Sequence, residues 1–206
     1  MSRGEVTKQA ILERAAGLAT QVGLEGLTIG RLADDLDLSK SGLFAHFQSK
    51  ESLQLSAMEY AAQRFIEAAV KPSFSAPRGE PRVRALFENW LAWPKKSGFP
   101  GGCFFVAASV ELDDRPGPVR DRLVQLQKDW LDTLAQAVRI AVAEKHLRDD
   151  TDPEQLAYEM YGIMLVCHHS MRLLRDPKAE VRARRAFDHL LERAHGQKRY
   201  PTRDIP

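Results

Sequence analysis

The chain has 206 residues, of which 44% are hydrophobic and 28% are charged. This composition is typical of an ordinary soluble protein, and the chain is long enough to bury a full core in one large or two modest domains. Its formal net charge of +2 excludes bulk electrostatics as an argument for nucleic-acid binding, which must instead depend on where particular basic residues lie.

Cysteine content and hydropathy indicate the cellular compartment in which the protein is expected. Cys103 and Cys167 are too few to form a disulfide framework, which fits a reducing cytoplasm. The N-terminus is polar and has no apolar signal core, and the most apolar run, residues 162–167, is far too short to span a bilayer. We therefore expect a cytoplasmic protein with no membrane segment.

The first predicted element is an amphipathic helix from Glu5 to Val22. Its apolar positions recur at helical spacing and are Val6, Ile11, Ala15, Leu18 and Val22. Gly23 is expected to end this helix, because glycine is the usual residue at a left-handed C-terminal position.

The stretch from Thr28 to Lys50 is predicted to form two short helices joined by a tight turn and followed by a third helix. The apolar face of the first helix consists of Ile29, Leu32, Ala33 and Leu36. The turn lies at Asp37-Leu38. Each helix is preceded by a residue whose hydroxyl can cap its free N–H groups, namely Thr28, Ser39 and Ser49.

The second of these helices, from Lys40 to about Phe47, has two different sides. Leu43 and Phe47 face inward. The outward side carries Lys40, Ser41, Gly42, Phe44 and His46. Lys50 lies in the first turn of the third helix, and a helix N-terminus with a lysine is suited to binding phosphate. This arrangement predicts a helix-turn-helix unit.

The rest of the chain is also predicted to be helical, which makes the expected fold class all-α. The helices are expected at residues 51–71, 82–93, 103–112, 118–144, 153–174 and 177–195. The helix at 82–93 must end before Pro94, because the residue ahead of a proline is disfavoured in the helical conformation. Asp152-Pro153 and Asp176-Pro177 are start signals for the last two helices, and Gly196 is expected to end the last one.

Several positions in and around the 28–50 stretch match a known family pattern. They are Ser39, Phe44, His46-Phe47 and Ser49-Lys50-Glu51, with Ile11, Ala15, Gly23 and Leu24 upstream. In these positions the N-terminal part of the chain resembles the DNA-binding domain of TetR-family bacterial transcriptional regulators. That family usually has a tyrosine where this chain has Phe44, so one phosphate hydrogen bond is given up, an effect of about 1 kcal/mol.

The resemblance and the outward-facing residues together predict the DNA contacts. Phosphate contacts are expected at Thr28, His46, Lys50 and the N–H groups capped by Ser49, with Phe44 against the sugar-phosphate backbone and Ser39 as the cap of the recognition helix. Base edges are expected near Lys40, Ser41, Gly42 and Leu43, with Lys40 as the reader of guanine. Arg3 and Lys8 lie where an N-terminal arm can reach DNA, and a solvated terminus is the equal alternative.

The predicted organisation has a helix-turn-helix domain at 1–50, a ligand-sensing and dimerisation domain at 51–196 and a loose tail at 197–206. The last two helices carry more apolar surface than one partner can cover, which predicts a homodimer through 153–174 and 177–195. Such a dimer would read a palindromic operator in double-stranded DNA.

A small apolar or aromatic effector is expected between helices of the second domain. The candidate wall residues are Trp90, Phe105, Trp130, Tyr161 and Met164. Effector binding would tilt the helix at 51–71, so that the two recognition helices no longer match successive grooves of the DNA. The expected function is therefore that of a ligand-responsive repressor, which is not an enzyme and needs no cofactor.

A metal site and an acid-base catalytic site are less well supported by the sequence. His168 and His169 point about 100° apart on a helix and do not converge on a metal, so no metal site is expected. An acidic cluster beside a Pro-Gly turn is expected to be a solvated loop, not a pair of catalytic acids, and consists of Glu111, Asp113 and Asp114.

Two alternative functions stay open. The first is a small-molecule-binding or enzymatic helical protein whose helix-turn-helix is vestigial. The second is a regulator that responds to oxidation of Cys103 or Cys167, although their apolar surroundings favour inert packing.

Overall fold

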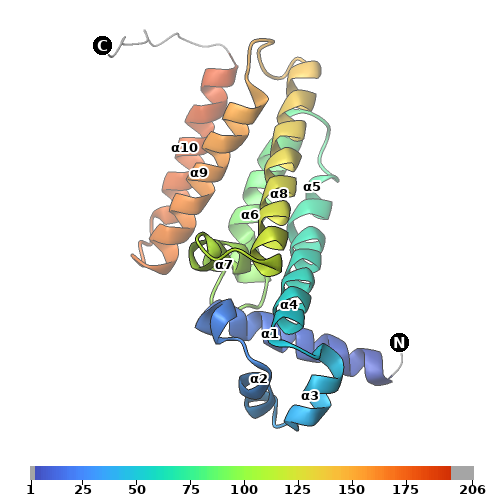
Figure 1. Ribbon diagram of the computed structural model, residues 1–206. Coiled ribbons are helices and arrows are strands. Elements are labelled where there is room, and N and C mark those ends of the chain that lie inside the picture. The colour runs from blue at the N-terminus through green and yellow to red at the C-terminus, as the bar shows by residue number, and fades with distance from the viewer. Residues whose placement is uncertain (1–2, 196–206) are drawn as a thin grey trace. The chain divides into compact units, whose positions relative to one another are not determined.

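The computed structural model describes residues 3–195, with side chains from Lys8 onward. Every regular element in this range is helical, which confirms the predicted all-α fold (Figure 1). The elements are α1 (Arg3–Gly26), α2 (Ile29–Leu36), α3 (Lys40–Phe47), α4 (Lys50–Phe65), the π-helical η1 (Ile66–Val70), α5 (Lys71–Ser73), α6 (Glu80–Lys96), α7 (Phe104–Leu112), α8 (Pro118–Ala143), α9 (Pro153–Arg172) and α10 (Ala179–Ala194). None of these described helices is long and apolar enough to cross a membrane. The predictions for Gly196 and for a tail at 197–206 lie outside the described residues.

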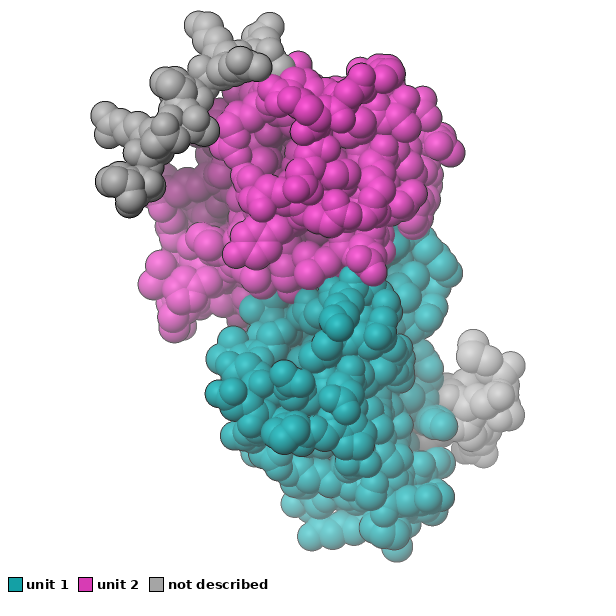
Figure 2. Space-filling model, turned by 45° about the horizontal axis from the view of Figure 1, so that its top comes forward, with its two compact units in different colours: residues 1–71, 92–129 teal, residues 72–91, 130–206 magenta. Residues whose placement is uncertain are grey.

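The chain divides into two compact units, each assembled from two separate segments (Figure 2). Unit 1 consists of residues 1–71 and 92–129, and unit 2 consists of residues 72–91 and 130–206. The division falls inside α6 and α8, so each of these helices contributes residues to both units. The domain boundary placed at residue 50 from the sequence stays a prediction.

Unit 1 is assembled around α1, which packs against α4 and α7 and also contacts α2. Its apolar face is buried, with Ile11 at 3% exposure and Ala15 at 0%. The guanidinium of Arg14 forms a two-pronged ion pair with the carboxylate of Asp35, which joins α1 to α2. The hydrogen bond from Arg14 holds the pKa of Asp35 below its ordinary value.

A kink at Gly23 separates the long part of α1 from a final turn at residues 24–26. Gly23 has φ 78° and ψ 162°, so it has the positive φ that the sequence predicted at the end of the helix. The residues after the kink lead directly to Thr28, the cap of α2.

The predicted helix at 51–71 is helical throughout, but it changes type along its length. α4 passes into the π-helical turn η1 and then into α5. Phe65, the last residue of α4, packs edge-on against Trp93 and Phe105, with ring centroids 5.4 Å and 5.9 Å away. The point where α4 becomes π-helical is therefore anchored in the aromatic core of unit 1.

In unit 2, α9 and α10 lie side by side and run in opposite directions (Figure 1). The N-terminal part of α6 is joined to α10 by a stacked pair of rings, Phe87 and Phe187, whose centroids are 4.0 Å apart. Arg84 adds an ion pair to Asp188 at 2.7 Å.

Pro94 does not end its helix, so that prediction is wrong. α6 continues to Lys96, and the N–H of Ser97 donates to the carbonyl of Trp93 at 2.8 Å. Pro94 lies in the last turn, where its missing N–H removes one hydrogen bond. Trp93 is 0% exposed and packs edge-on against Phe99 at 5.8 Å, and this burial offsets the local cost.

The last helix begins at Ala179, later than the predicted start at Pro177. The carboxylate of Asp176 accepts a hydrogen bond from the N–H of Lys178 at 2.9 Å and so holds a turn ahead of the helix. An Asp-Pro pair is therefore a correct sign of a nearby helix start here, but not of its first residue.

Candidate nucleic-acid interface

Hydroxyl caps fix the starts of α2, α3 and α4. The hydrogen bonds run from the N–H of Arg31 to Thr28 Oγ1 (3.1 Å), from Gly42 to Ser39 Oγ (3.1 Å) and from Ser52 to Ser49 Oγ (3.0 Å). Asp37 makes the turn between α2 and α3 with φ 53°. The structure thus has all the caps that the sequence predicted for this unit.

The two sides of α3 differ as predicted. Leu43 and Phe47 are each 1% exposed, so they belong to the core of unit 1. The exposed side carries the predicted residues Lys40, Ser41, Gly42, Phe44 and His46, and Ala45 is exposed as well. Phe44 has 55% of its surface exposed, although it is a large aromatic residue. Such a side chain is free to pack on a sugar-phosphate backbone.

The structure narrows the predicted set of base contacts. The side chain of Leu43 packs into the core, which leaves Lys40, Ser41 and Gly42 as the exposed candidates for base edges. Lys8 is exposed on the first part of α1. α1 begins at Arg3, whose side chain lies outside the described ones.

Lys50 has a partner that the sequence did not reveal. Its ammonium group forms an ion pair with the carboxylate of Glu25, at the end of α1. The hydrogen bond from Lys50 holds the pKa of Glu25 below its ordinary value. Arg115 Nη1 lies 3.7 Å from the same carboxylate. The phosphate predicted at Lys50 would therefore have to compete with Glu25.

The predicted effector residues are divided between the two units. Phe105 is in unit 1, where it packs against Phe65. The others are in unit 2, where Trp90, Trp130 and Met164 are buried and the Trp90 and Tyr161 rings meet edge-on at 6.5 Å. Their assignment to an effector pocket stays a prediction.

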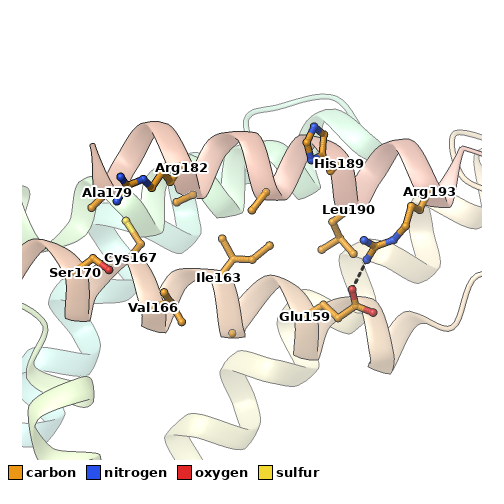
Figure 3. A pocket seen from close by; sticks show the side chains of 13 residues that line it. Glu159, Ile163, Val166, Cys167, Ser170, Ala179, Arg182, His189, Leu190 and Arg193 are labelled. Carbon is orange, nitrogen blue, oxygen red and sulfur yellow. Dashed lines mark hydrogen bonds and ion pairs between the residues drawn. The ribbon is translucent and has the colours of Figure 1, made fainter. Parts of the chain in front are cut away.

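A cavity of about 600 Å³ lies along the surface groove between α9 and α10 (Figure 3). None of the predicted effector residues lines it. Its walls consist of Glu159, Gly162, Ile163, Val166, Cys167, Ser170, Ala179, Arg182, Ala183, Ala186, His189, Leu190 and Arg193. Arg193 and Glu159 form an ion pair at 2.5 Å across one end of the groove.

Both cysteines are packed in the interior. Cys103 is 1% exposed and Cys167 is 3% exposed. Burial raises the pKa of the Cys103 thiol, which disfavours the reactive thiolate. Among the described residues, His, Cys, Asp and Glu side chains form no cluster suited to a metal ion.

Glu111 is not in a solvated loop, contrary to the prediction. It lies on α7, and its carboxylate accepts hydrogen bonds from the backbone N–H groups of Leu24 (2.7 Å) and Glu25 (2.6 Å). The residues are 87 and 86 positions apart in the sequence. Asp113 and Asp114 follow α7 and are exposed.

Taken together, two short capped helices with a buried inner side, a polar outer side and a capped third helix form a helix-turn-helix module. Comparison with protein families agrees. A model described as bacterial regulatory proteins, tetR family, matches residues 11–57, and one described as tetracyclin repressor-like, C-terminal domain, matches residues 79–187. The chain belongs to the TetR family of bacterial regulators. A search of curated proteins gave no match.

Solved structures share the fold over nearly the whole chain. A TetR regulator from Chloroflexus aurantiacus is 24% identical with a TM-score of 0.82, covering 93% of this chain and 96% of its own. A TetR-family regulator from Cytophaga hutchinsonii is 18% identical with a TM-score of 0.82, covering 96% and 99%. AibR, in complex with isovaleryl coenzyme A and operator DNA, is 22% identical with a TM-score of 0.68, covering 90% and 96%.

Proposed function

We propose that the protein is a non-enzymatic transcriptional repressor that binds a palindromic double-stranded operator as a homodimer and is released by a small apolar or aromatic effector. The observation that carries the DNA-binding part is the exposed side of α3, where Lys40, Ser41 and Gly42 lie over the buried Leu43 and Phe47. A helix held in this way can enter a major groove without exposing its core. AibR and CifR are neighbours solved with operator DNA, which supports the same partner class.

Two lysines have different proposed roles. Lys40 is exposed on the first turn of α3 and reads a base edge, with guanine O6 and N7 as the matching acceptors. Lys50 lies in the first turn of α4, where the N–H groups and the ammonium bind a phosphate once Glu25 releases the lysine. Base contacts specify sequence, whereas phosphate contacts fix position on the duplex.

The test is a titration of the protein against the DNA that flanks its own gene, measured by fluorescence anisotropy across a salt series. Tight, palindrome-protecting binding with a steep salt dependence is expected. Lys40→Ala should lower the preference for operator over unrelated DNA, and Lys50→Ala should weaken both about equally.

Lys145→Ala is the matched control, because Lys145 lies in unit 2 and pairs with Asp149 on the surface. It should leave binding unchanged. A uniform loss in both the Lys40 and the Lys50 variants would show that Lys40 does not read bases. Weak binding of the unaltered protein to every sequence would contradict the proposed function and favour a vestigial helix-turn-helix.

The proposed dimer uses the outer faces of α9 and α10. Large apolar side chains are exposed there, with Tyr158 at 71% and Val166 at 65% on α9, Leu173 at 71% directly after α9, and Val181 at 66% on α10. Gly162 lies on the same face as Tyr158 and Val166, and apart from its own stretch of helix no atom approaches within 4 Å of the position a Cβ would occupy there. A second copy of the chain would cover this apolar stripe and produce a four-helix bundle.

Sedimentation velocity tests the dimer. Val166→Glu places a charge in the proposed interface and should convert the dimer to a monomer. Val110→Glu is the control, because Val110 is even more exposed, at 76%, but lies on α7. A monomeric unaltered protein at micromolar concentration, or equal effects of the two substitutions, would contradict the proposed interface.

The effector is proposed to bind in unit 2, where Trp90, Trp130 and Met164 are buried and the rings of Trp90 and Tyr161 meet edge-on. A ligand can shift the protein between two states only through different affinities for them. Candidate compounds are therefore compared by tryptophan fluorescence with and without operator. A compound that binds equally well in both cases is not the effector.

A further inference from the structure

The junction between α1 and α2 is held by side chains from two other helices of unit 1. The N–H groups of Leu24 and Glu25 follow the kink at Gly23, and both donate to the carboxylate of Glu111 on α7, at 2.7 Å and 2.6 Å. The carbonyl of Leu24 accepts a hydrogen bond from Gln54 Nε2 on α4 at 2.6 Å. Leu24 therefore has its donor bound to α7 and its acceptor bound to α4.

Burial and backbone conformation around Leu24 show that its hydrogen bonds to Glu111 and Gln54 are part of the packed structure. Gln54 is buried, at 8% exposure, so its amide requires a partner, and Leu24 is 2% exposed. Gly23 has a positive φ, and a Cβ added to it would lie 2.8 Å from Glu111 Oε2. Only glycine combines this backbone conformation with the close approach of the carboxylate.

The junction lies immediately before the DNA-binding helices. Leu27, which follows it, is fully buried, and Thr28 then caps α2. α2 leads through the turn at Asp37 into α3, whose exposed side carries the proposed base contacts. The backbone that leads into α2 and α3 is therefore held by Glu111 and Gln54, and its position affects the orientation of these two helices relative to α4.

We propose that Glu111 and Gln54 are positioning residues that set the orientation of the recognition helix through the backbone of Leu24 and Glu25. Neither side chain touches DNA in this role. The proposal rests on the proposed DNA-binding function for its biological meaning, but the orientation itself is a property of the protein alone. A displacement of Glu111 on α7 would therefore change the orientation of α3 through this junction.

The test uses Glu111→Gln and Gln54→Met. Glutamine at position 111 retains the shape but replaces one acceptor oxygen with an NH2 group, which cannot accept from a backbone N–H. Methionine at position 54 retains the volume and removes the donor. The control is Glu59→Gln, because the Glu59 carboxylate also joins two helices of unit 1, through Arg122, without touching the junction.

The first readout needs no DNA. Amide hydrogen exchange should accelerate at least tenfold in Glu111→Gln at whichever of Leu24 and Glu25 loses its acceptor oxygen, while the core of α1 at Ala15 stays protected. Residual dipolar couplings of the α2 and α3 amides should change relative to those of α4 in both junction variants and not in Glu59→Gln. Unchanged couplings in both junction variants would overturn the positioning role.

The second readout is the ratio of operator affinity to affinity for unrelated DNA. It should fall about tenfold in the junction variants, because two recognition helices must match successive grooves while non-specific phosphate binding tolerates misorientation. An unchanged ratio with changed couplings would mean that the orientation is not used for recognition, which also overturns the proposal. If the unaltered protein binds no operator, the proposed function fails, and the dipolar couplings alone decide whether Glu111 and Gln54 set the orientation.

Discussion

Replacing Phe44 by tyrosine should increase affinity for DNA. The ring is 55% exposed on the outer side of α3, so a hydroxyl added at its tip reaches solvent and carries no burial cost. Against a phosphate oxygen, such a hydroxyl contributes about 1 kcal/mol. A dimer bound to a palindrome has two such hydroxyls, so the operator complex should gain about 2 kcal/mol, or about thirtyfold in Kd.

The assay is an anisotropy titration of Phe44→Tyr with operator and with unrelated DNA. Both affinities should rise, because a phosphate contact carries no sequence information, and the salt dependence should stay unchanged, because no charge is added. Phe74→Tyr is the control, since Phe74 has nearly the same exposure, 52%, but lies in unit 2. If Phe44→Tyr leaves both affinities unchanged, Phe44 does not face the DNA backbone.

Two further predictions concern stability and assembly. Burial raises the pKa of Glu80, but hydrogen bonds from His195 and Arg84 lower it by more, so the pKa lies below the ordinary 4.5. The stability that this carboxylate contributes is complete above 4.5 and is lost as the pH falls through the folded pKa, so thermal melts should show a steeper acid loss for the unaltered protein than for Glu80→Gln. Equal slopes would show that the Glu80 contacts do not persist in solution. Gly162→Ala should stabilise the helical conformation of α9 by about 1 kcal/mol, because alanine has a higher helix propensity than glycine. It should also weaken dimerisation, measured by sedimentation velocity. A dimer of unchanged affinity would show that no second copy packs closely at Gly162.

Much of the candidate DNA-binding site followed from the sequence because its signals are local. The caps at Thr28, Ser39 and Ser49 act on N–H groups two or three residues away, so their spacing alone predicts three helix starts. The burial of Leu43 and Phe47 follows from their separation by one turn of helix.

Predictions from neighbouring residues failed where packing against residues distant in the sequence determined the local structure. Pro94 predicts a helix end, but Trp93 beside it packs into an aromatic core with Phe65 and Phe99, and α6 continues past the proline. The sequence had no means of revealing that Phe65 would meet Trp93, because Phe65 lies on a separate helix, α4.

The sequence by itself determined that the chain is helical, where the recognition helix lies and which of its residues face outward, since periodicity and capping are properties of neighbouring residues. Only the tertiary structure decided that Lys50 is paired with Glu25 and that Glu111 holds the backbone at Leu24. A carboxylate 87 positions away leaves no periodic signal, because its partner is a backbone group that every residue possesses. The contacts that orient the helix-turn-helix unit are therefore visible only when the chain is folded.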